Sequence, residues 1–159
     1  MEPEKLLKAL HTVGKLKTTM RHCYTDTGRK ESVAEHSWRV ALMAYWLEDE
    51  FPDVDMNKVI KMCLIHDLGE CFTGDIPCFK KTDANEKTEE NLLFNWVATL
   101  PAPFDKEMRA LYDEMCERKT LEAQIYKALD NMEGVLAHNE SAIETWEPHE
   151  YELTKNYGI

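Results

Sequence analysis

The sequence predicts an all-α protein, and two observations support this prediction. Apolar residues recur at spacings of three and four residues along nearly the whole chain, which is the period of amphipathic helices. Alternating runs rich in β-branched residues, which are typical of strands, are nearly absent. We therefore expect about six to seven helices, at residues 3–13, 32–50, 55–70, 84–99, 104–118 and 120–139, with a shorter one within 142–155.

Polar or proline-containing segments separate the expected helices. A polar turn at residues 25–30 (TDTGRK) precedes the second helix, and residues 51–55 (FPDVD) precede the third with a proline and an aspartate that suits a helix N-cap. Residues 74–77 (GDIP) lead into a polar loop before the fourth helix, whose solvated first half is followed by the apolar run LLFNWVATL. Residues 100–103 (LPAP) then separate the fourth helix from the fifth.

Length and composition indicate one folded domain over residues 1–159, because this is close to the size of an ordinary domain. Hydrophobic residues make up 43% of the chain and charged residues 31%, as in globular proteins. The 19 basic and 30 acidic residues give a net charge of −11, which repels a phosphate backbone. We therefore expect no polymeric nucleic acid as a partner, whereas a small anionic substrate still fits if a metal ion and a few cations reverse the potential inside one pocket.

The sequence also indicates the cellular location in which we expect this protein. No stretch approaches the roughly 20 apolar residues of a membrane-spanning helix, and residues 1–17 are too mixed in charge for a signal peptide or a membrane anchor. The cysteines are odd in number and lack C-x-x-C spacing, which argues against a disulfide framework or a thiolate zinc site; they are Cys23, Cys63, Cys71, Cys78 and Cys116. We expect a reducing cytoplasm and no membrane association.

Three of the expected helices place ligand-type side chains on otherwise apolar faces. The apolar stripe of the second helix extends back by one turn to His36, and the stripe of the third helix extends forward to His66, with Asp67 beside it. In the long helix at 120–139, Asp130 interrupts a face of small and aromatic residues. Taken alone, an inward histidine is more simply explained as a hydrogen-bonded core residue. The adjacent His66 and Asp67 favour a metal site.

The chemistry of this set of residues points to one divalent cation. Burying an unpaired carboxylate costs several kcal/mol after relaxation, and a cation offsets that cost. Two imidazoles and two carboxylates suit Mn, Fe, Co, Ni or Zn better than Ca, with Mg as a further alternative, and they leave coordination positions open for catalysis. The predicted metal ligands are His36, His66, Asp67 and Asp130.

Three further residues are candidates for handling protons and substrate. Glu70 lies one turn beyond His66 if the helix continues through Gly69, which is a suitable position for a general acid or base. Asp75 suits the orientation of substrate hydroxyls or of the attacking water, and the planar guanidinium of Arg21 suits a phosphate. An Asx turn for Asp75 and a surface ion pair for Arg21 explain these residues equally well. Lys80 and Lys81 are further candidates for stabilising charge on the phosphoryl oxygens, although we expect them to face solvent.

These residues resemble a known family. The order His36, His66-Asp67, Asp130 is similar to the H…HD…D signature of the HD-domain superfamily of metal-dependent phosphohydrolases. The segments LKTTMR, ESVAEHS, HDLGE, TGDIP and ALDNME occur in an order and at a spacing similar to the subgroup that contains bacterial 5′-deoxynucleotidases and their eukaryotic HD-domain relatives. The resemblance covers residues 14–140 and implies an HD-domain helical bundle, a homodimer, and metal-dependent hydrolysis of deoxynucleoside 5′-monophosphates to nucleoside and phosphate.

The resemblance also assigns roles to individual residues. It implies metal ligation by the four residues already proposed, catalysis or substrate orientation by Glu70 and Asp75, and substrate contact by Arg21. One position departs from the family: the bacterial enzymes follow the arginine with a tryptophan that crowds the sugar, whereas this chain has His22. We expect His22 to contact the substrate, by stacking on the sugar or by hydrogen bonding to it.

Other functions fit parts of the sequence. An all-α nucleotide pyrophosphohydrolase would hold magnesium with helical ExxE pairs, for which the candidates are Glu86 with Glu89 and Glu114 with Glu117, although solvated helix faces also explain these glutamates. An HD-type di-iron oxygenase would need a second set of ligands, for which His11, His22, His138 and His149 are available without forming another HD-like cluster. A non-catalytic helical dimer that binds nucleotides is the last alternative.

Overall fold

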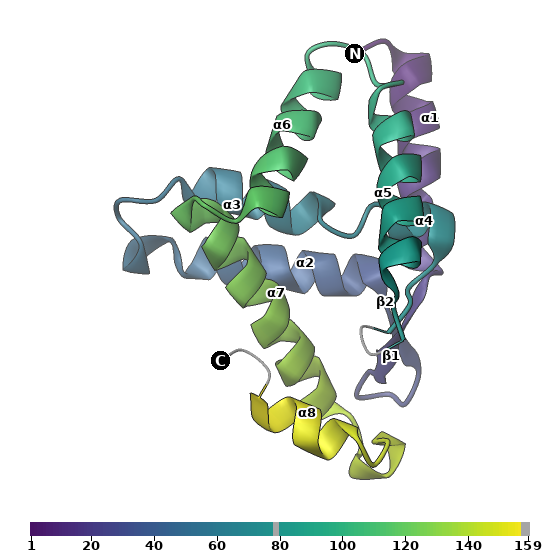
Figure 1. The fold of residues 1–159 in the computed structure, drawn as a ribbon, viewed down its shortest axis with the longest axis vertical. Helices are drawn as coiled ribbons and strands as arrows, with labels where there is room; N and C mark the ends of the chain where they lie inside the picture. Colours follow the sequence, from purple (N-terminus) through teal and green to yellow (C-terminus); the bar gives the residue numbers. More distant parts are fainter. Residues whose placement is uncertain (78–79, 157–159) are drawn as a thin grey trace.

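A computed structural model describes residues 1–77 and 80–156, and within them the all-α prediction is confirmed (Figure 1). The α-helices are α1 (Pro3–Val13), α2 (Val33–Trp46), α3 (Met56–Ile65), α4 (Glu70–Thr73), α5 (Asp83–Val97), α6 (Phe104–Glu117), α7 (Leu121–Glu140) and α8 (Glu150–Asn156). Short 3₁₀ turns follow α1 at Gly14–Lys17, α2 at Glu48–Glu50 and α7 at Ile143–Thr145. Two short strands, β1 (Met20–Tyr24) and β2 (Lys30–Ser32), lie between α1 and α2.

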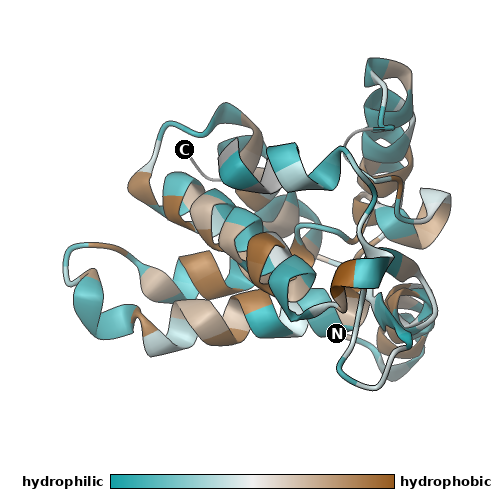
Figure 2. Cartoon of the chain, turned by 90° about the horizontal axis from the view of Figure 1, so that it is seen from below, coloured by the Kyte–Doolittle hydropathy of each residue, from teal (hydrophilic) through white to brown (hydrophobic). Residues whose placement is uncertain are grey.

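The centre of the fold is the contact between α2, α3 and α7. Figure 1 shows α2 and α3 side by side, with α7 crossing them, and each of the three helices packs on the other two. Their facing residues form the core, in which Val40, Val59 and Met62 are completely buried. In Figure 2 the helices carry both hydrophobic and hydrophilic residues, as expected for amphipathic helices with one face in the core.

Side-chain hydrogen bonds cap the N-termini of the three central helices α2, α3 and α7. Ser32 Oγ accepts the backbone N–H of Glu35 at 3.3 Å, and the Glu35 carboxylate accepts the N–H of Ser32 at 2.8 Å, so that α2 starts with a capping box. The N-cap predicted at Asp55 is confirmed, because its carboxylate accepts the N–H of Lys58 at 3.0 Å. Thr120 caps α7 in the same way. These caps satisfy N–H groups that a helix leaves without partners.

A β-hairpin was not expected from the sequence. β1 pairs antiparallel with β2, and the predicted polar turn at residues 25–30 supplies most of the connection. The N–H of Thr25 donates to the carbonyl oxygen of Arg29 at 2.8 Å, and Gly28 adopts a φ of 79°, which glycine tolerates best. The strands are too short and too polar for an alternating pattern to reveal them. β1 packs against α7 and thereby brings its residues to the site.

The third expected helix, at residues 55–70, is shorter than predicted. α3 ends at Ile65, and the chain continues to α4 through tighter turns, in which the N–H of Leu68 donates to Ile65 O at 3.1 Å and the N–H of Glu70 to Asp67 O at 3.0 Å. Gly69 has low helix propensity, and its missing side chain admits α5, since a Cβ there would lie 2.7 Å from Cγ of Glu89. Glu70 is therefore placed by a turn and not by a continuing helix.

Two other helix boundaries also differ from the prediction. The helix expected at 32–50 ends at Trp46, because the three acidic residues at 48–50 would meet the negative end of the helix dipole. The helix expected within 142–155 begins only at Glu150, after Pro148, which disfavours helical backbone at the residue before it.

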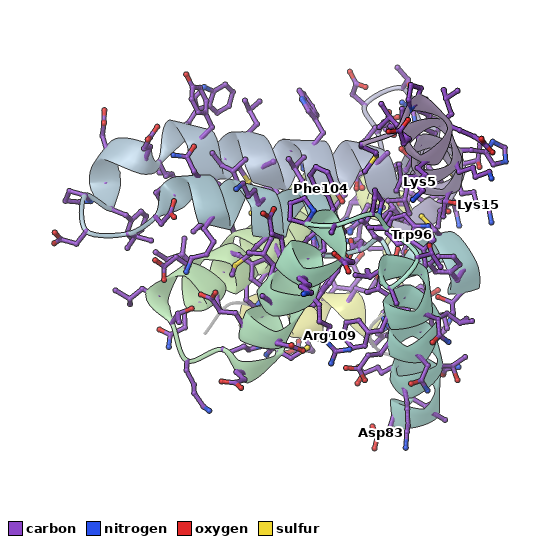
Figure 3. The ribbon with its side chains drawn as sticks, turned by 90° about the horizontal axis from the view of Figure 1, so that it is seen from above. Lys5, Lys15, Asp83, Trp96, Phe104 and Arg109 are labelled. Carbon is purple, nitrogen blue, oxygen red and sulfur yellow. The ribbon has the colours of Figure 1, made fainter. Side chains whose placement is uncertain are left out.

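Aromatic contacts hold α4 and α5 in place. The Phe72 and Trp96 rings have centroids 6.2 Å apart, and Lys15 Nζ lies 5.9 Å from the Phe72 ring centroid. On the other side of α5, the Arg109 guanidinium lies 3.7 Å from the centroid of Phe94 (Figure 3 labels Lys15, Trp96 and Arg109). These contacts fix the segment that carries Glu70.

Two findings bear on the expected location. Among the described residues, no helix has both the length and the apolar character that crossing a bilayer requires. The cysteines at 23, 63, 71 and 116 are free thiols, and Cys78 lies outside the described residues.

Candidate metal centre and its pocket

The four predicted ligands meet where α2, α3 and α7 come together. His36 Nε2 lies 3.1 Å from His66 Nε2 and 3.1 Å from Asp130 Oδ1. His66 Nε2 lies 3.1 Å from Asp67 Oδ2 and 3.4 Å from Asp130 Oδ1, and His36 Nε2 lies 3.6 Å from Asp67 Oδ2. Two ligand atoms bound to one metal at about 2.1 Å are roughly 3.0–3.4 Å apart when the angle between them is between square and tetrahedral. The distances that join the two imidazoles to each other and to both carboxylates are therefore close to those of a coordination shell, and His36, His66 and Asp67 form the tightest group.

Both carboxylates of this centre are held in the ionised form that a metal requires. Burial alone would raise the pKa of Asp67, but the adjacent His66 and, more weakly, His36 lower it to about 2. Burial would also raise the pKa of Asp130, and hydrogen bonds with the same two imidazoles hold it well below its ordinary value. Burial disfavours charge on the imidazoles, yet these carboxylates raise the pKa of His36 and His66. A cation that replaces the imidazole protons would keep the charge balance.

Each imidazole is oriented from behind by an acceptor at Nδ1. His66 Nδ1 lies 2.8 Å from the carbonyl oxygen of Cys63, and His36 Nδ1 contacts Oε2 of Glu133. Glu133 is completely buried, and it also accepts a hydrogen bond from Arg39 Nε at 2.7 Å. Sequence reasoning missed Glu133, although it lies three residues after Asp130, on the same face of α7, and inside the motif ALDNME. Both histidines thus direct Nε2 at the centre.

Glu70 stands next to these residues without a hydrogen-bond partner of its own. Its side chain is buried, and Oε2 makes no hydrogen bond with the described residues. Burial, and then the negative charges of Asp67, Asp75 and Glu89, raise the pKa of Glu70 to about 9. A buried carboxyl group that holds its proton at neutral pH is suited to proton transfer.

One pocket, with a volume of about 330 Å³, connects the candidate metal centre to the outside. Its lining includes every predicted site residue except His36 and His66, which lie behind the wall. The lining residues are Arg21, His22, Cys23, Asp67, Glu70, Asp75, Ile76, Pro77, Lys81, Glu86, Lys127, Asp130, Gly134, Val135, His138 and Glu150. The sequence had not indicated that residues of α7 beyond Asp130, or Glu150 of α8, line this pocket.

Arg21 reaches the pocket from β1 and is largely buried. Its Nε lies 3.2 Å from Glu31 Oε2, and a terminal nitrogen lies 3.8 Å from Glu133. The ion pair considered for Arg21 therefore exists, but it is not on the surface. Asp75 also lines the pocket, just after Gly74, whose φ of 76° turns the chain towards it.

His22 is joined to the C-terminal part of the chain. Its Nε2 lies 2.9 Å from Glu150 Oε1, and its ring stacks on that of His138 with centroids 6.4 Å apart. Glu150 is itself buried and lies 3.5 Å from Nε2 of His138. Residues from β1, α7 and α8 thus form one connected part of the pocket wall. Sequence spacing carried no signal for this contact, because more than a hundred residues separate its partners.

Lys81 was expected to face solvent, and this expectation is wrong. Its Nζ forms an ion pair with Glu89 at 3.0 Å, and its side chain lines the pocket. Lys127, also in the pocket wall, lies 2.7 Å from Asp130 Oδ2. Together with Arg21, these lysines place positive charge around the pocket of an acidic protein.

The acidic pairs of the pyrophosphohydrolase alternative serve other purposes. Glu89 accepts a hydrogen bond from Thr73 at 3.1 Å and pairs with Lys81, whereas Glu114 pairs with Lys58 at 3.0 Å and accepts from Thr120 at 2.6 Å. One glutamate of each pair is therefore already bound to a lysine among the described residues, which argues against a magnesium site made of ExxE pairs.

Comparison with known proteins agrees with this arrangement. A family model described as an HD domain matches residues 13–159. The chain belongs to the HD-domain family. The 5′-deoxynucleotidase HDDC2 of Bos taurus is 33% identical over 139 residues, which cover 85% of this chain and 67% of the relative. The 5′-deoxynucleotidase HDDC2 of Dictyostelium discoideum is 35% identical over 133 residues, covering 77% of this chain and 70% of the relative.

A solved structure agrees as well. A predicted metal-dependent phosphohydrolase from Magnetospirillum magnetotacticum superposes on this HD domain with a TM-score of 0.80 at 32% identity, covering 92% of this chain and 76% of the other. The predicted HD-domain family and helical fold are thereby confirmed.

Proposed function

We propose that this HD domain is a divalent-metal-dependent phosphohydrolase that converts deoxynucleoside 5′-monophosphates to nucleoside and phosphate. The observation that carries the proposal is the convergence of two imidazoles, whose Nε2 atoms are 3.1 Å apart, with two carboxylates that each lie 3.1–3.6 Å from these nitrogens, beside a pocket of about 330 Å³. The relatives named 5′-deoxynucleotidase support the substrate class.

The donor set fits a single divalent transition metal. His36, His66, Asp67 and Asp130 would hold the ion, and their two nitrogen and two oxygen donors suit Mn, Fe, Co, Ni or Zn, with Mg as an alternative. When bound, the ion would supply a Lewis acid that polarises the phosphoryl group and lowers the pKa of a water.

The protein's own residues would bind the phosphate and handle the proton. Arg21, Lys81 and Lys127 line the pocket beside several carboxylates, and together with a bound divalent cation they would attract the phosphate despite the net charge of −11. Glu70 is buried, and its Oε2 makes no hydrogen bond with the described residues, so that it would exchange a proton with the attacking water or with the departing nucleoside oxygen.

The other pocket residues would hold the nucleoside. Asp75 would accept hydrogen bonds from sugar hydroxyls, because an ionised carboxylate is an acceptor. His22 would contact the sugar from the opposite side, and its partners Glu150 and His138 would extend this wall towards the base. Because His22 replaces a tryptophan, the choice between deoxyribose and ribose would depend on this wall.

We further propose that residues 1–159 act as one HD domain, that the protein is a homodimer, and that it works in the cytoplasm. The family match over residues 13–159 supports the first point. The exposed aromatic side chains of Trp38, Tyr45 and Trp46 on α2 are compatible with a subunit interface. The free thiols among the described cysteines suit a reducing compartment.

The experiment that tests the function measures phosphate release and bound metal together. The purified protein is assayed with a panel of deoxy- and ribonucleoside monophosphates and added Mn²⁺, Co²⁺ or Mg²⁺. We expect turnover of the deoxy forms, and loss of both metal and turnover in Asp67→Ala. Full phosphate release by an Asp67→Ala protein without metal would contradict the mechanism. Pyrophosphate release from triphosphates, or tight nucleotide binding without turnover, would favour the alternatives.

A further inference from the structure

A completely buried carboxylate lies directly behind the candidate metal centre. Glu133 of α7 is 0% exposed, as is His36 of α2, whose Nδ1 contacts Glu133 Oε2. The other carboxylate oxygen, Oε1, accepts a hydrogen bond from Nε of Arg39 at 2.7 Å. The two oxygens of one carboxylate thus serve two different donors.

This arrangement restricts which ring nitrogen of His36 carries the proton. The guanidinium of Arg39 can only donate, so it occupies Oε1 as an acceptor. The remaining oxygen, Oε2, is an acceptor as well, and it favours a proton on Nδ1 of His36. The lone pair is then on Nε2, which faces His66 and Asp130 and is the nitrogen that a metal would bind.

The same cluster does not need a cation of its own. Glu31, His36 and Glu133 lie close enough together to hold an ion. However, Arg21 lies 3.2 Å from Glu31 and 3.8 Å from Glu133, and Arg39 is bonded to Glu133. Two guanidinium groups therefore compensate the two carboxylates. The cluster is better explained as a charge-balanced support for His36.

We propose that Glu133 is a positioning residue that holds His36 in its metal-binding tautomer, and that Arg39 determines which Glu133 oxygen faces the imidazole. The inference rests on the proposed function, in which His36 is a metal ligand. Glu133 lies behind the candidate metal centre and is not among the residues that line the pocket. Because Glu133 also lies 3.8 Å from Arg21, its role is tested by metal affinity in the absence of substrate and not by turnover.

Replacing Glu133 by glutamine separates this role from packing. The amide has the same shape but only one acceptor atom, while Arg39 and the Nδ1–H of His36 both require one. If the amide oxygen faces Arg39, its NH₂ group faces His36 and favours the tautomer with a proton on Nε2. If the amide is flipped, its NH₂ group opposes the Arg39 donor. Metal binding, which needs the proton on Nδ1 of His36, therefore places either this N–H or the Arg39 donor against the amide NH₂ group, and both arrangements are unfavourable.

The test compares metal affinity in four variants. The metal-free protein is titrated with Co²⁺ and Mn²⁺, and the dissociation constants of native protein, Glu133→Gln, Arg39→Met and Arg39→Met/Glu133→Gln are compared. We expect a loss of about 10–100-fold in Glu133→Gln. Arg39→Met should stay near the native value. The double variant should recover affinity, because the amide oxygen is then free to accept from His36.

Two results would overturn the proposal: native metal affinity in Glu133→Gln, or a double variant as weak as Glu133→Gln. Glu140→Gln is the matched control, because Glu140 touches Arg39 at 2.6 Å on the exposed side, and it should leave metal affinity unchanged. Thermal unfolding of each variant checks that the fold is retained.

A second measurement separates this inference from the proposed function. Nitrogen-15 NMR of the metal-free proteins, at a pH above the titration of His36, reports its tautomer directly. We expect the proton on Nδ1 in native protein and on Nε2 in Glu133→Gln, and the same tautomer in both would refute the positioning role. Absence of phosphate release by native protein, with this tautomer difference intact, would refute only the proposed function.

Discussion

Replacing Glu70 by glutamine should strongly reduce turnover and at the same time stabilise the metal-free protein. In the folded protein, burial and neighbouring negative charges raise the pKa of Glu70 from 4.5 to about 9, whereas the unfolded chain keeps the ordinary value. Below pH 4.5 both states carry the proton, and this group costs no stability. As the pH rises from about 5 to about 9, the unfolded state ionises first, so stability is progressively lost.

The size of the effect follows from the same values. At pH 7 the unfolded group is about 2.5 pH units above its pKa of 4.5, and each unit corresponds to about 1.4 kcal/mol. At this pH the native metal-free protein therefore loses about 3.5 kcal/mol of unfolding free energy that Glu70→Gln keeps. In a protein of this size, each kcal/mol changes the melting temperature by about 2–4 °C. Turnover should fall about a hundredfold to ten-thousandfold with the loss of the proton-transfer group.

Urea unfolding of the metal-free proteins at several pH values checks this prediction. The native and Glu70→Gln curves of unfolding free energy should coincide below about pH 4 and separate increasingly as the pH rises towards about 9. Glu90→Gln, which changes an exposed glutamate of α5, is the control and should follow the native curve. A constant difference between native and Glu70→Gln across this range would refute the reasoning. A bound divalent cation should reduce the difference, because positive charge favours the ionised carboxylate.

Two substitutions outside the pocket test how the site is supported. Ser32→Ala removes the cap that accepts the N–H of Glu35 at 3.3 Å, and should lower the free energy of unfolding by about 1 kcal/mol in urea titrations. An unchanged urea midpoint would mean that α2 does not depend on this cap. Tyr112→Phe removes the hydroxyl that donates to Ile65 O at 2.6 Å, and should also lower the free energy of unfolding by about 1 kcal/mol. The loss stays this small because the same carbonyl still accepts the N–H of Leu68 at 3.1 Å. Calorimetry would contradict this if the melting temperature stayed the same.

Sequence reasoning succeeded where the relevant information is local. Helical periodicity placed His36, His66 and Asp130 on inward faces, and the structure brings these residues together with Asp67. The sequence also predicted that Glu70 lies beside them. That prediction assumed a helix that continues through Gly69, whereas a turn places Glu70 there. The close approach of Glu89 to Gly69 involves another helix and cannot be read from spacing.

The residues that sequence reasoning missed depend on contacts between distant segments. Glu133 gains its role only when α7 packs on α2, where it meets His36 and Arg39. Glu150 enters the pocket because α8 folds against β1 and meets His22. Lys81 looked like a solvated charge until α5 supplied its partner. Burial of such polar groups is set by the packing partner, which has no fixed spacing in the sequence.

The sequence by itself determined the helical character of this protein, the order of its metal-site residues and its acidic charge. These properties follow from side-chain chemistry and from the helical period, which act over a few residues. Only the tertiary structure decided that the four candidate ligands lie close together, that Glu133 contacts His36, and that the pKa of Glu70 is raised. The physical reason is that hydrogen-bond pairing, desolvation and charge coupling depend on distances across helices, and these distances exist only once α2, α3 and α7 have packed together.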